Sequence, residues 1–172
     1  MTATEKSILI ALGSNLSHPD WGAPPLILAA AINFLEKAEI YTRAHSSIWS
    51  SAAWPDPRDP RYANAVIAVE TPLPSDQLLD RLHAIEAAFG RDRSAVNAPR
   101  TLDLDLLAYG REVRAGPRAP ILPHPRLQER GFVLRPLAEI CPSWRHPVSG
   151  QGVAALLAAL DPADDCRLWS AA

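Results

Sequence analysis

The chain has 172 residues, of which 48% are hydrophobic and 21% are charged, and its net charge is −2. Since domains of about 100–200 residues are typical, we expect one domain over residues 1–172. This composition excludes intrinsic disorder, and the near-neutral charge excludes a dedicated nucleic-acid or anionic-membrane binder, which would carry a large excess of Lys and Arg.

The first half of the chain predicts a strand, a helix and a hairpin. Residues 7–12, SILIAL, form an apolar run that ends at the turn-forming residues 13–15. Pro24 and Pro25 suit the first turn of a helix. Residues that follow at helical spacing are Leu26, Ala29, Ala30, Asn33, Phe34 and Lys37. Residues 40–49 and 62–71 are predicted as antiparallel strands, joined by a loop that holds three prolines.

The second half adds a helix and the clearest strand. Pro74 and Ser75 open a helix, and Gly90 is its predicted C-terminal cap. Its apolar stripe consists of Leu78, Leu79, Leu82, Ile85 and Phe89. Residues 101–109, TLDLDLLAY, form the strand. The order β-α-β-β-α-β predicts an α+β, ferredoxin-like fold, an antiparallel sheet with helices packed on one face, followed by a C-terminal extension.

Targeting signals and cysteine patterns are absent from the sequence. No apolar run approaches the ~18 residues of a membrane helix, and the N-terminus has no basic segment followed by a long apolar one. Cys141 and Cys166 lie far apart and in no zinc-binding pattern, so we expect two free thiols. We therefore expect a cytoplasmic protein that does not bind a membrane.

Asp103 and Asp105 are the first candidates for chemistry. Strand alternation places them on one face and the neighbouring leucines on the other. Residues two apart in a strand are separated by roughly 6.5–7 Å at Cα, so both carboxylates can hold two Mg²⁺ ions at ~3.5–4 Å from each other. The alternative is a pair of solvated aspartates on an exposed sheet face.

Arginines gather around this strand. Residues 91–135 hold nine Arg against five acidic residues, whereas the rest of the chain is acidic on balance. Three basic residues precede the strand and three follow it: Arg91, Arg93, Arg100, His124, Arg126 and Arg130. Guanidinium groups pair well with phosphate oxygens. The pattern favours phosphoryl transfer, with a solvated basic face as the alternative, and no P-loop or kinase-type glycine loop accompanies it.

Several short blocks occur in order between about residue 7 and residue 147. They are Leu12-Gly13-Ser14-Asn15-Leu16, Tyr62-x-Asn64-Ala65, Gly90-Arg91-x-Arg93, Pro99-Arg100-Thr101-Leu102-Asp103-Leu104-Asp105, Pro123-His124-Pro125 and Arg130-Gly131-Phe132. In these blocks the chain resembles the 6-hydroxymethyl-7,8-dihydropterin pyrophosphokinase family of folate biosynthesis. The resemblance implies a ferredoxin-like enzyme that transfers the β,γ-diphosphate of ATP to the hydroxymethyl group of the pterin and releases AMP.

The resemblance also implies roles for individual residues. Asp103 and Asp105 would bind two Mg²⁺ ions, and ATP would be the co-substrate. The implied catalytic residues are Arg91, Arg93, Asp103 and Asp105. The implied ATP site consists of Glu86, Arg91, Arg93, Arg100, Leu106, His124 and Arg130. The implied pterin site consists of the backbone around Ser51, Ala52, Ala53 and Trp54, the side chain of Asn64, and the rings of Tyr62 and Phe132, which would stack on the pterin.

Each of these residues has a structural interpretation when taken alone. Tyr62 and Phe132 fit core aromatics, Asn64 fits a buried capping side chain, and His124 fits a surface histidine. Two other functions also stay open. An Asp-x-Asp pair occurs in nucleotide-sugar transferases, and a non-catalytic pterin- or nucleotide-binding paralogue of the same fold would need neither the aspartates nor the arginines. We expect a monomer that acts on small molecules and binds no nucleic acid.

The chain departs from the family pattern at three places. Residues 51–54, Ser-Ala-Ala-Trp, stand where many members have Thr-Pro-Pro and a small or aliphatic residue. Residues 96–98, Val-Asn-Ala, replace a common Arg-Trp-Gly, and Ala119 stands where an Arg can contact ATP. None of these departures removes an implied metal ligand. We therefore expect activity, with residues 90–99 closing over the phosphates in an altered way.

Overall fold

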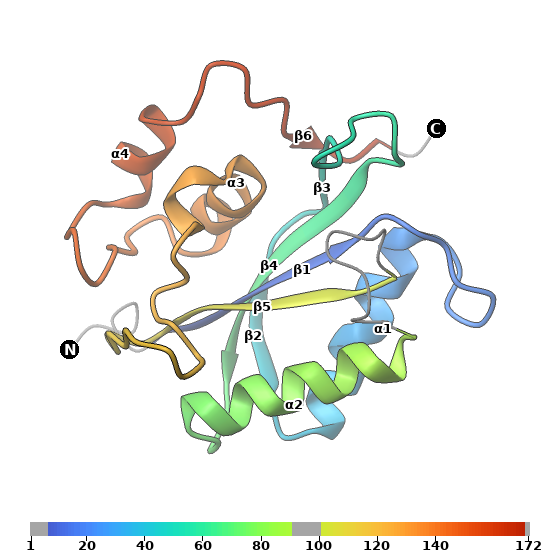
Figure 1. Cartoon of the computed structure of the whole chain (residues 1–172), viewed down its shortest axis with the longest axis horizontal. Helices are drawn as coiled ribbons and strands as arrows, with labels where there is room; N and C mark the ends of the chain where they lie inside the picture. Colours follow the sequence, from blue (N-terminus) through green and yellow to red (C-terminus); the bar gives the residue numbers. More distant parts are fainter. Residues whose placement is uncertain (1–6, 91–100, 171–172) are drawn as a thin grey trace.

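The computed structural model describes residues 7–90 and 101–170. Its elements follow one another as β1 (Ile8–Ser14), α1 (Pro24–Lys37), β2 (Tyr41–His45), β3 (Trp49–Ser51), β4 (Tyr62–Glu70), α2 (Ser75–Ala88), β5 (Asp103–Tyr109), the 3-10 helix η2 (Leu127–Glu129), α3 (Gly131–Ile140), α4 (Val153–Ala158) and β6 (Arg167–Leu168). Figure 1 shows how these elements are arranged.

The strands form one antiparallel sheet in the order β5-β1-β4-β3-β6, with β2 also paired to β4. When β2 and β3 are counted as one interrupted strand, the β-α-β-β-α-β unit has the strand order of a ferredoxin-like core. The predicted fold class is therefore confirmed. The short strand β6 lies beyond this unit and extends the sheet at its β3 edge.

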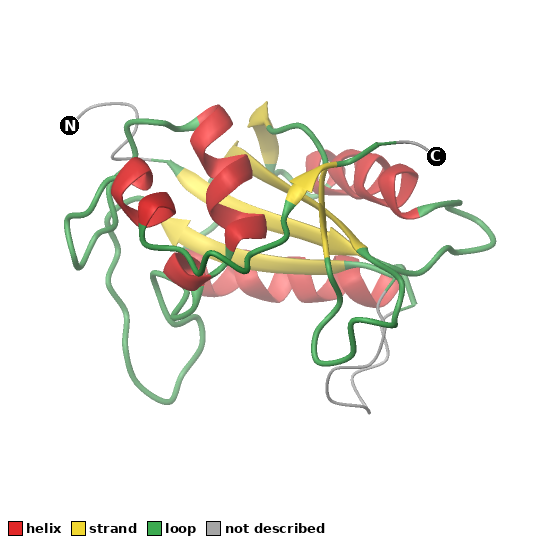
Figure 2. Ribbon diagram, turned by 90° about the horizontal axis from the view of Figure 1, so that it is seen from above, coloured by secondary structure: helices red, strands yellow, loops and turns green. Residues whose placement is uncertain are grey.

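Helices cover both faces of the sheet. Helices α1 and α2 pack over one face through Ile27, Leu35, Leu78 and Leu82, which share a core with Leu104 of β5. On the other face, α3 and α4 supply a second core that includes the buried Trp144. Figure 2 shows the strands passing through the middle of the molecule between the helices. The expectation of helices on one face holds for α1 and α2, and the C-terminal extension adds the second layer.

The predicted strand over residues 40–49 is interrupted. Ser46 donates its backbone N–H to the Val66 carbonyl at 3.0 Å, and its Oγ accepts the Val66 N–H at 3.0 Å. A serine hydroxyl that bonds to the neighbouring backbone competes with the regular ladder. As a result β2 ends at His45 and β3 starts at Trp49.

The two long helices begin where the prolines predict, but α1 buries a different face. Its buried residues are Ile27, Leu28, Ala31 and Leu35, whereas Leu26 is 61% exposed. Helix α1 is apolar on several sides, so spacing alone does not select the face that meets the sheet. In α2 the predicted stripe is buried except for Leu79, which is half-buried, and Gly90 follows with a φ of 77°, as a C-terminal cap requires.

Three further expectations concern membrane helices, the cysteines and the loop that holds three prolines. In residues 7–90 and 101–170, no helix is long and apolar enough to span a bilayer. Both cysteines are free thiols, and burial raises the pKa of Cys166 to about 12. The loop over residues 54–60 has no helix or strand, as its three prolines predict.

Candidate active site

The register of three strands brings Asn64, Gly13 and Asp103 into one row. Gly13 of β1 pairs with Asn64 of β4 on one side and with Asp103 of β5 on the other. Asp105 lies two residues further along β5 and therefore on the same face as Asp103. The leucines between and beside the aspartates lie in the core beneath α1 and α2. The predicted alternation of this strand is confirmed.

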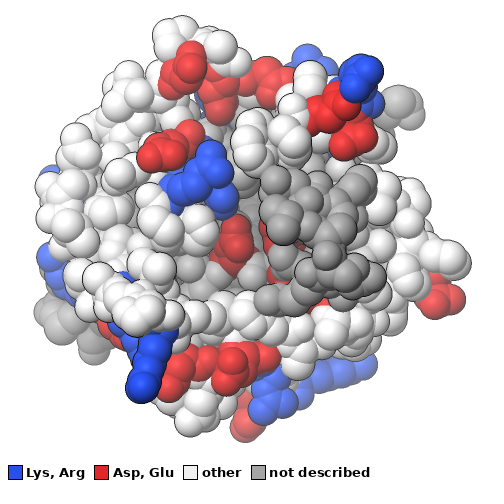
Figure 3. All heavy atoms as spheres, in the orientation of Figure 1, with Lys and Arg blue, Asp and Glu red and all other residues white. Residues whose placement is uncertain are grey.

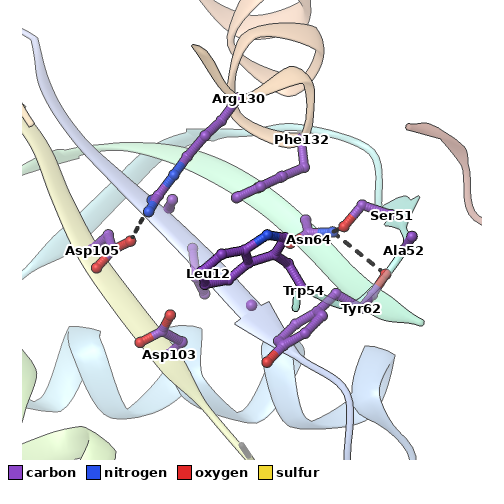
Figure 4. Close-up of a pocket in the computed structure, with 12 residues that line it drawn as sticks. Leu12, Ser51, Ala52, Trp54, Tyr62, Asn64, Asp103, Asp105, Arg130 and Phe132 are labelled. Atoms are coloured by element: carbon purple, nitrogen blue, oxygen red, sulfur yellow. Dashed lines mark hydrogen bonds and ion pairs between the residues drawn. The ribbon is translucent and has the colours of Figure 1, made fainter. Parts of the chain in front are cut away.

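A pocket of about 140 Å³ opens over this row, on the face of the sheet that α3 covers. Its lining consists of Ala11, Leu12, Gly13, Ser51, Ala52, Trp54, Tyr62, Asn64, Asp103, Asp105, Arg130 and Phe132. Figure 4 shows these side chains converging from β1, β4, β5 and the start of α3. In Figure 3, acidic atoms lie recessed near the centre of the view, with basic atoms beside them. The pocket therefore has an ionic half and an apolar, amide-bearing half.

Gly13 keeps the pocket open between these halves. A Cβ at this position would lie 3.6 Å from Asn64 Oδ1 and 3.9 Å from the Asp103 Cβ. Such distances are ordinary contacts, so a side chain would fit sterically but would fill the floor of the pocket. The space needed between Asn64 and Asp103 thus explains why a glycine suits this position of the LGSN block.

Asp105 is the centre of the ionic half. Its Oδ2 accepts a hydrogen bond from Arg130 Nη1 at 3.1 Å and lies 4.0 Å from His124 Nε2. Burial lowers the pKa of His124, and the charge of Asp105 opposes this effect. His124 Nδ1 accepts the Arg126 N–H at 3.2 Å, so a neutral ring carries its proton on Nε2, facing Asp105.

Asn64 is the centre of the other half. It is 4% exposed, and its Nδ2 donates to Ser51 Oγ at 3.0 Å, which ties β4 to the end of β3. Phe132 stands across the pocket with the Arg130 guanidinium 5.5 Å from its ring centroid. Trp54 is 69% exposed, and its ring also lines the pocket. In Figure 4 the Trp54 indole points in among these side chains.

Most of the implied pterin site gathers in this pocket, whereas Ala53 of that site and Glu86, Leu106 and His124 of the implied ATP site do not line it. Ala53 is 6% exposed and Leu106 is 4% exposed, and Leu106 belongs to the core beneath α1 and α2. Glu86 is fully buried, and its Oε1 accepts the Leu104 N–H at 2.7 Å. The side chains of Ala53, Leu106 and Glu86 thus lie in the interior, and the ligand contacts implied for these three residues stay predictions.

The arginines of residues 91–135 are not one cluster in the described part of this segment. Arg130 lines the pocket, Arg135 bonds to Asp164, and Arg114 lies 4.0 Å from Glu112. Arg91, Arg93 and Arg100 lie outside the described residues. The substitutions at 96–98 and the expected closure of residues 90–99 lie there too, apart from Gly90 itself. Their roles stay predictions.

Sequence reasoning missed a set of contacts behind the pocket wall. Arg61 donates from Nη1 to Asp165 Oδ2 at 2.5 Å and from Nε to Ser50 Oγ at 2.8 Å. These residues are up to 104 positions apart in the chain, and no motif connects them. Only the pairing of β6 with β3 brings them together.

Oxygen ligands in the pocket fit magnesium. In the described residues, no three His, Cys, Asp or Glu side chains gather to hold a metal ion. Magnesium seldom needs such a cage, because it keeps several waters and is bound by one or two carboxylates together with substrate phosphates. Asp103 and Asp105 line one pocket from adjacent positions on the same strand face, so they fit magnesium that arrives with a polyphosphate.

Comparison with known proteins finds a matching family model and similar relatives. Residues 9–142 match the family model of 7,8-dihydro-6-hydroxymethylpterin-pyrophosphokinase. The chain is 40% identical over 152 residues to 2-amino-4-hydroxy-6-hydroxymethyldihydropteridine pyrophosphokinase of Pseudomonas aeruginosa, which covers 88% of this chain and 90% of that protein. It is 36% identical over 154 residues to the protein of the same name from Methylorubrum extorquens, which covers 89% and 92% of the two chains.

Solved structures share the fold. Plasmodium falciparum HPPK-DHPS aligns with a TM-score of 0.63 and 12% identity, over 88% of this chain. The chain spans 44% of the length of that protein. At this identity the likeness concerns the fold alone.

Proposed function

The chain belongs to the 7,8-dihydro-6-hydroxymethylpterin-pyrophosphokinase family, and from that membership we propose that it transfers the β,γ-diphosphate of ATP to the hydroxymethyl group of 6-hydroxymethyl-7,8-dihydropterin. The products are the pterin diphosphate and AMP, and the reaction is a step of folate biosynthesis. One observation carries the proposal: a single pocket joins two strand aspartates to a buried amide and an aromatic ring. That combination suits a polyphosphate at one end and a flat heterocycle at the other.

The ionic half binds the triphosphate. Asp103 and Asp105 would hold two Mg²⁺ ions, which when bound neutralise the phosphate oxygens and draw the hydroxyl and the β-phosphate together. Arg130 reaches into this half and can exchange its bond to Asp105 for phosphate oxygens. His124, neutral and with its proton on Nε2, can donate one further hydrogen bond there. Positioning and charge neutralisation supply most of the catalysis in such transfers.

The other half binds the pterin. Asn64 offers its Oδ1 as an acceptor at the edge of the ring while its Nδ2 donates to Ser51 Oγ, and its burial makes an unpaired partner costly. Phe132 and Tyr62 line the pocket and offer apolar faces to a flat ring. The pterin hydroxymethyl group then points toward the aspartates, because Asn64 and Asp103 flank Gly13 in one row of the sheet.

The reaction forms one bond and breaks one. The hydroxymethyl oxygen attacks the β-phosphorus of ATP, and the bond from that phosphorus to the α,β-bridging oxygen breaks. The bridging oxygen keeps the electron pair and leaves with AMP, while the hydroxyl proton passes to solvent. No covalent enzyme intermediate is required.

A direct test measures AMP formation from ATP and Mg²⁺ with and without 6-hydroxymethyl-7,8-dihydropterin. We expect AMP to appear only with the pterin, in equal amount to the pterin diphosphate. Formation of ADP would contradict diphosphate transfer. Tight binding of both substrates without any turnover would instead favour the non-catalytic paralogue.

A further inference from the structure

The C-terminal segment returns to the edge of the candidate site. The family match ends at residue 142, after which the chain forms α4 and the strand β6. Strand β6 pairs with β3, with Arg167 opposite Ser50 and Leu168 opposite Trp49. Figure 1 shows β6 beside β3 at the far end of a long excursion over α3. Residues 164 and 165, just before β6, therefore reach both β3 and α3.

Asp165 fixes the β3 wall of the pocket. Its Oδ1 accepts the Ala52 N–H at 3.1 Å, and its Oδ2 accepts Arg61 Nη1 at 2.5 Å. Arg61 in turn donates to Ser50 Oγ at 2.8 Å. Residues 51–53 contain no proline whose ring would restrict φ, so these hydrogen bonds add to the restraint that the pairing of β3 with β4 gives to Ser51.

Asp164 fixes the α3 wall. Its Oδ1 lies 3.3 Å from both Nε and Nη2 of Arg135, which belongs to α3. The same carboxylate sits against Gly131, the first residue of α3, so closely that a Cβ there would overlap with it. Phe132, the aromatic residue of the pocket, follows Gly131 directly. The glycine of the RGF block is thus the place where the C-terminal segment touches the helix that carries Phe132.

We propose that Asp164 and Asp165 are positioning residues that hold the two walls of the pterin half at a fixed separation, and so set the affinity for the pterin. The proposal rests on the proposed function. Asp165 contacts the wall formed by Ser51 and Ala52, and Asp164 contacts the start of the helix that carries Phe132 on the opposite wall. Neither aspartate lines the pocket. They act through the backbone of Ala52 and the start of α3.

The two aspartates of the ionic half are held by other contacts, and Arg130, which directly precedes Gly131, is tied to them through its bond to Asp105. Asp103 and Asp105 lie on β5, which pairs along its length with β1 and is bonded to α2 through Glu86. Loosening the C-terminal segment therefore moves the pterin wall and leaves the aspartates in place. This difference predicts a selective loss, with pterin binding affected and nucleotide binding preserved.

The test compares Asp164→Ala, Asp165→Ala and the milder Asp165→Asn with Asp161→Ala in the full-length chain. Asp161 belongs to the same segment, and its carboxylate accepts the Ala163 N–H within its own turn, so it serves as the matched control. We expect the KM for the pterin to rise about tenfold or more in the first three variants, since small misplacements of binding groups cost at least this much. The KM for ATP and the kcat should stay within about twofold of wild type.

A second readout does not depend on substrates. Cys166 follows Asp165 and is 7% exposed. Its backbone N–H donates to Asp164 Oδ1 at 3.3 Å, which helps to hold it in place. In a Cys141→Ser background, Asp164→Ala and Asp165→Asn should speed alkylation of Cys166 about tenfold or more, because the segment opens locally. Asp161→Ala should not. The thermal unfolding midpoint of each variant shows whether the rest of the chain stays folded.

The outcomes are separable. If the wild-type protein is active and the Asp164 and Asp165 variants keep its KM for the pterin, the positioning role is overturned. Equal rises in the KM values for the pterin and for ATP overturn it as well. Faster Cys166 alkylation with a selective rise in pterin KM supports it. A wild-type protein that neither binds nor turns over the pterin overturns the proposed function itself and with it the effect on pterin affinity. The alkylation rates then decide independently whether the two aspartates hold the segment.

Discussion

Arg130 Nη1 lies 3.1 Å from Asp105 Oδ2, so a guanidinium shares the carboxylate that we assign to magnesium. Both side chains line the same pocket, Arg130 from the start of α3 and Asp105 from β5. The pair joins the two elements. If magnesium and phosphate bind as proposed, they compete with this pair for Asp105 and Arg130.

Arg130 should therefore oppose metal binding to the free protein while assisting turnover. We expect Arg130→Ala to bind Mg²⁺ alone several-fold more tightly and to lower kcat at least ~10-fold, since a charge partner of the phosphates is lost. Calorimetry with Mg²⁺ and steady-state kinetics measure the two effects. Arg43→Ala is the control, because Arg43 of β2 pairs with Glu70 of β4 at 2.6 Å and does not line the pocket. Weaker metal binding in Arg130→Ala would refute the competition.

Asp103 and Asp105 should be essential for turnover and dispensable for folding. Asp103→Asn and Asp105→Asn keep the side-chain shape and remove the charge, so we expect kcat to fall by roughly two orders of magnitude or more. Circular dichroism and thermal unfolding should match wild type. The exposed Asp80→Asn on α2 is the matched control. Near-normal turnover of both site variants in saturating Mg²⁺ would exclude the assignment.

Stacking and hydrogen bonding in the pterin half should be separable from nucleotide binding. Phe132→Ala removes an aromatic contact worth about 0.5–1.5 kcal/mol beyond area burial. Asn64→Ala leaves polar groups of the pterin unpaired at a cost of roughly 1–3 kcal/mol. Calorimetry with a non-hydrolysable ATP analogue present should show weaker pterin binding in both variants. If the variants lost nucleotide binding and kept the pterin, the two halves would be assigned in reverse.

Glu86 should matter for stability rather than for direct ligand contact. Its buried carboxylate accepts the N–H of Leu104, the residue between the two aspartates. Glu86→Ala leaves this donor without its acceptor in the interior and should cost about 1–3 kcal/mol of unfolding free energy. Urea titration measures the change. If Glu86→Ala kept the unfolding midpoint and lost affinity for ATP, a direct contact of Glu86 with ATP would be favoured instead.

Asp165 should make the stability pH-dependent in a defined direction. The hydrogen bond from Arg61 lowers the pKa of Asp165, and the Ala52 N–H acts in the same direction, as does the charge of Arg167. A carboxyl whose folded pKa lies below its unfolded value stabilises the fold above about pH 4 and loses this effect as the pH falls through the folded pKa. The stability difference between wild type and Asp165→Asn should therefore shrink in urea titrations below about pH 4. A difference that grows on acidification would contradict this linkage.

The sequence predicts the parts of the fold that depend on local pattern. Alternation in TLDLDLL placed both aspartates on one face of β5, and the prolines located the starts of α1 and α2. Local pattern failed where side chains act on distant backbone. Ser46 bonds to the backbone of Val66 and thereby interrupts a strand. Glu86 of α2 is buried against the sheet, where its carboxylate accepts the N–H of Leu104 in β5.

The contacts behind the pocket wall, such as that of Arg61 with Asp165, cannot be predicted from local sequence pattern for the same reason. Arg61 and Asp165 meet because β6 pairs with β3, and two residues of strand give too weak a pattern to predict that pairing. The family blocks contain most of the residues that line the pocket, whereas Ser51, Ala52 and Trp54 belong to a stretch that departs from the family pattern. Their partners behind the wall belong to no block.

The most direct measurement is the fate of each phosphate of ATP. The protein is incubated with Mg²⁺, the hydroxymethyl pterin and ATP labelled separately at the α-, β- or γ-phosphorus. Transfer of a diphosphate predicts that the β and γ labels both appear in the pterin product and that the α label appears in AMP. A pterin that carries the γ label alone, or labels released as free phosphate or pyrophosphate, would contradict the proposed reaction.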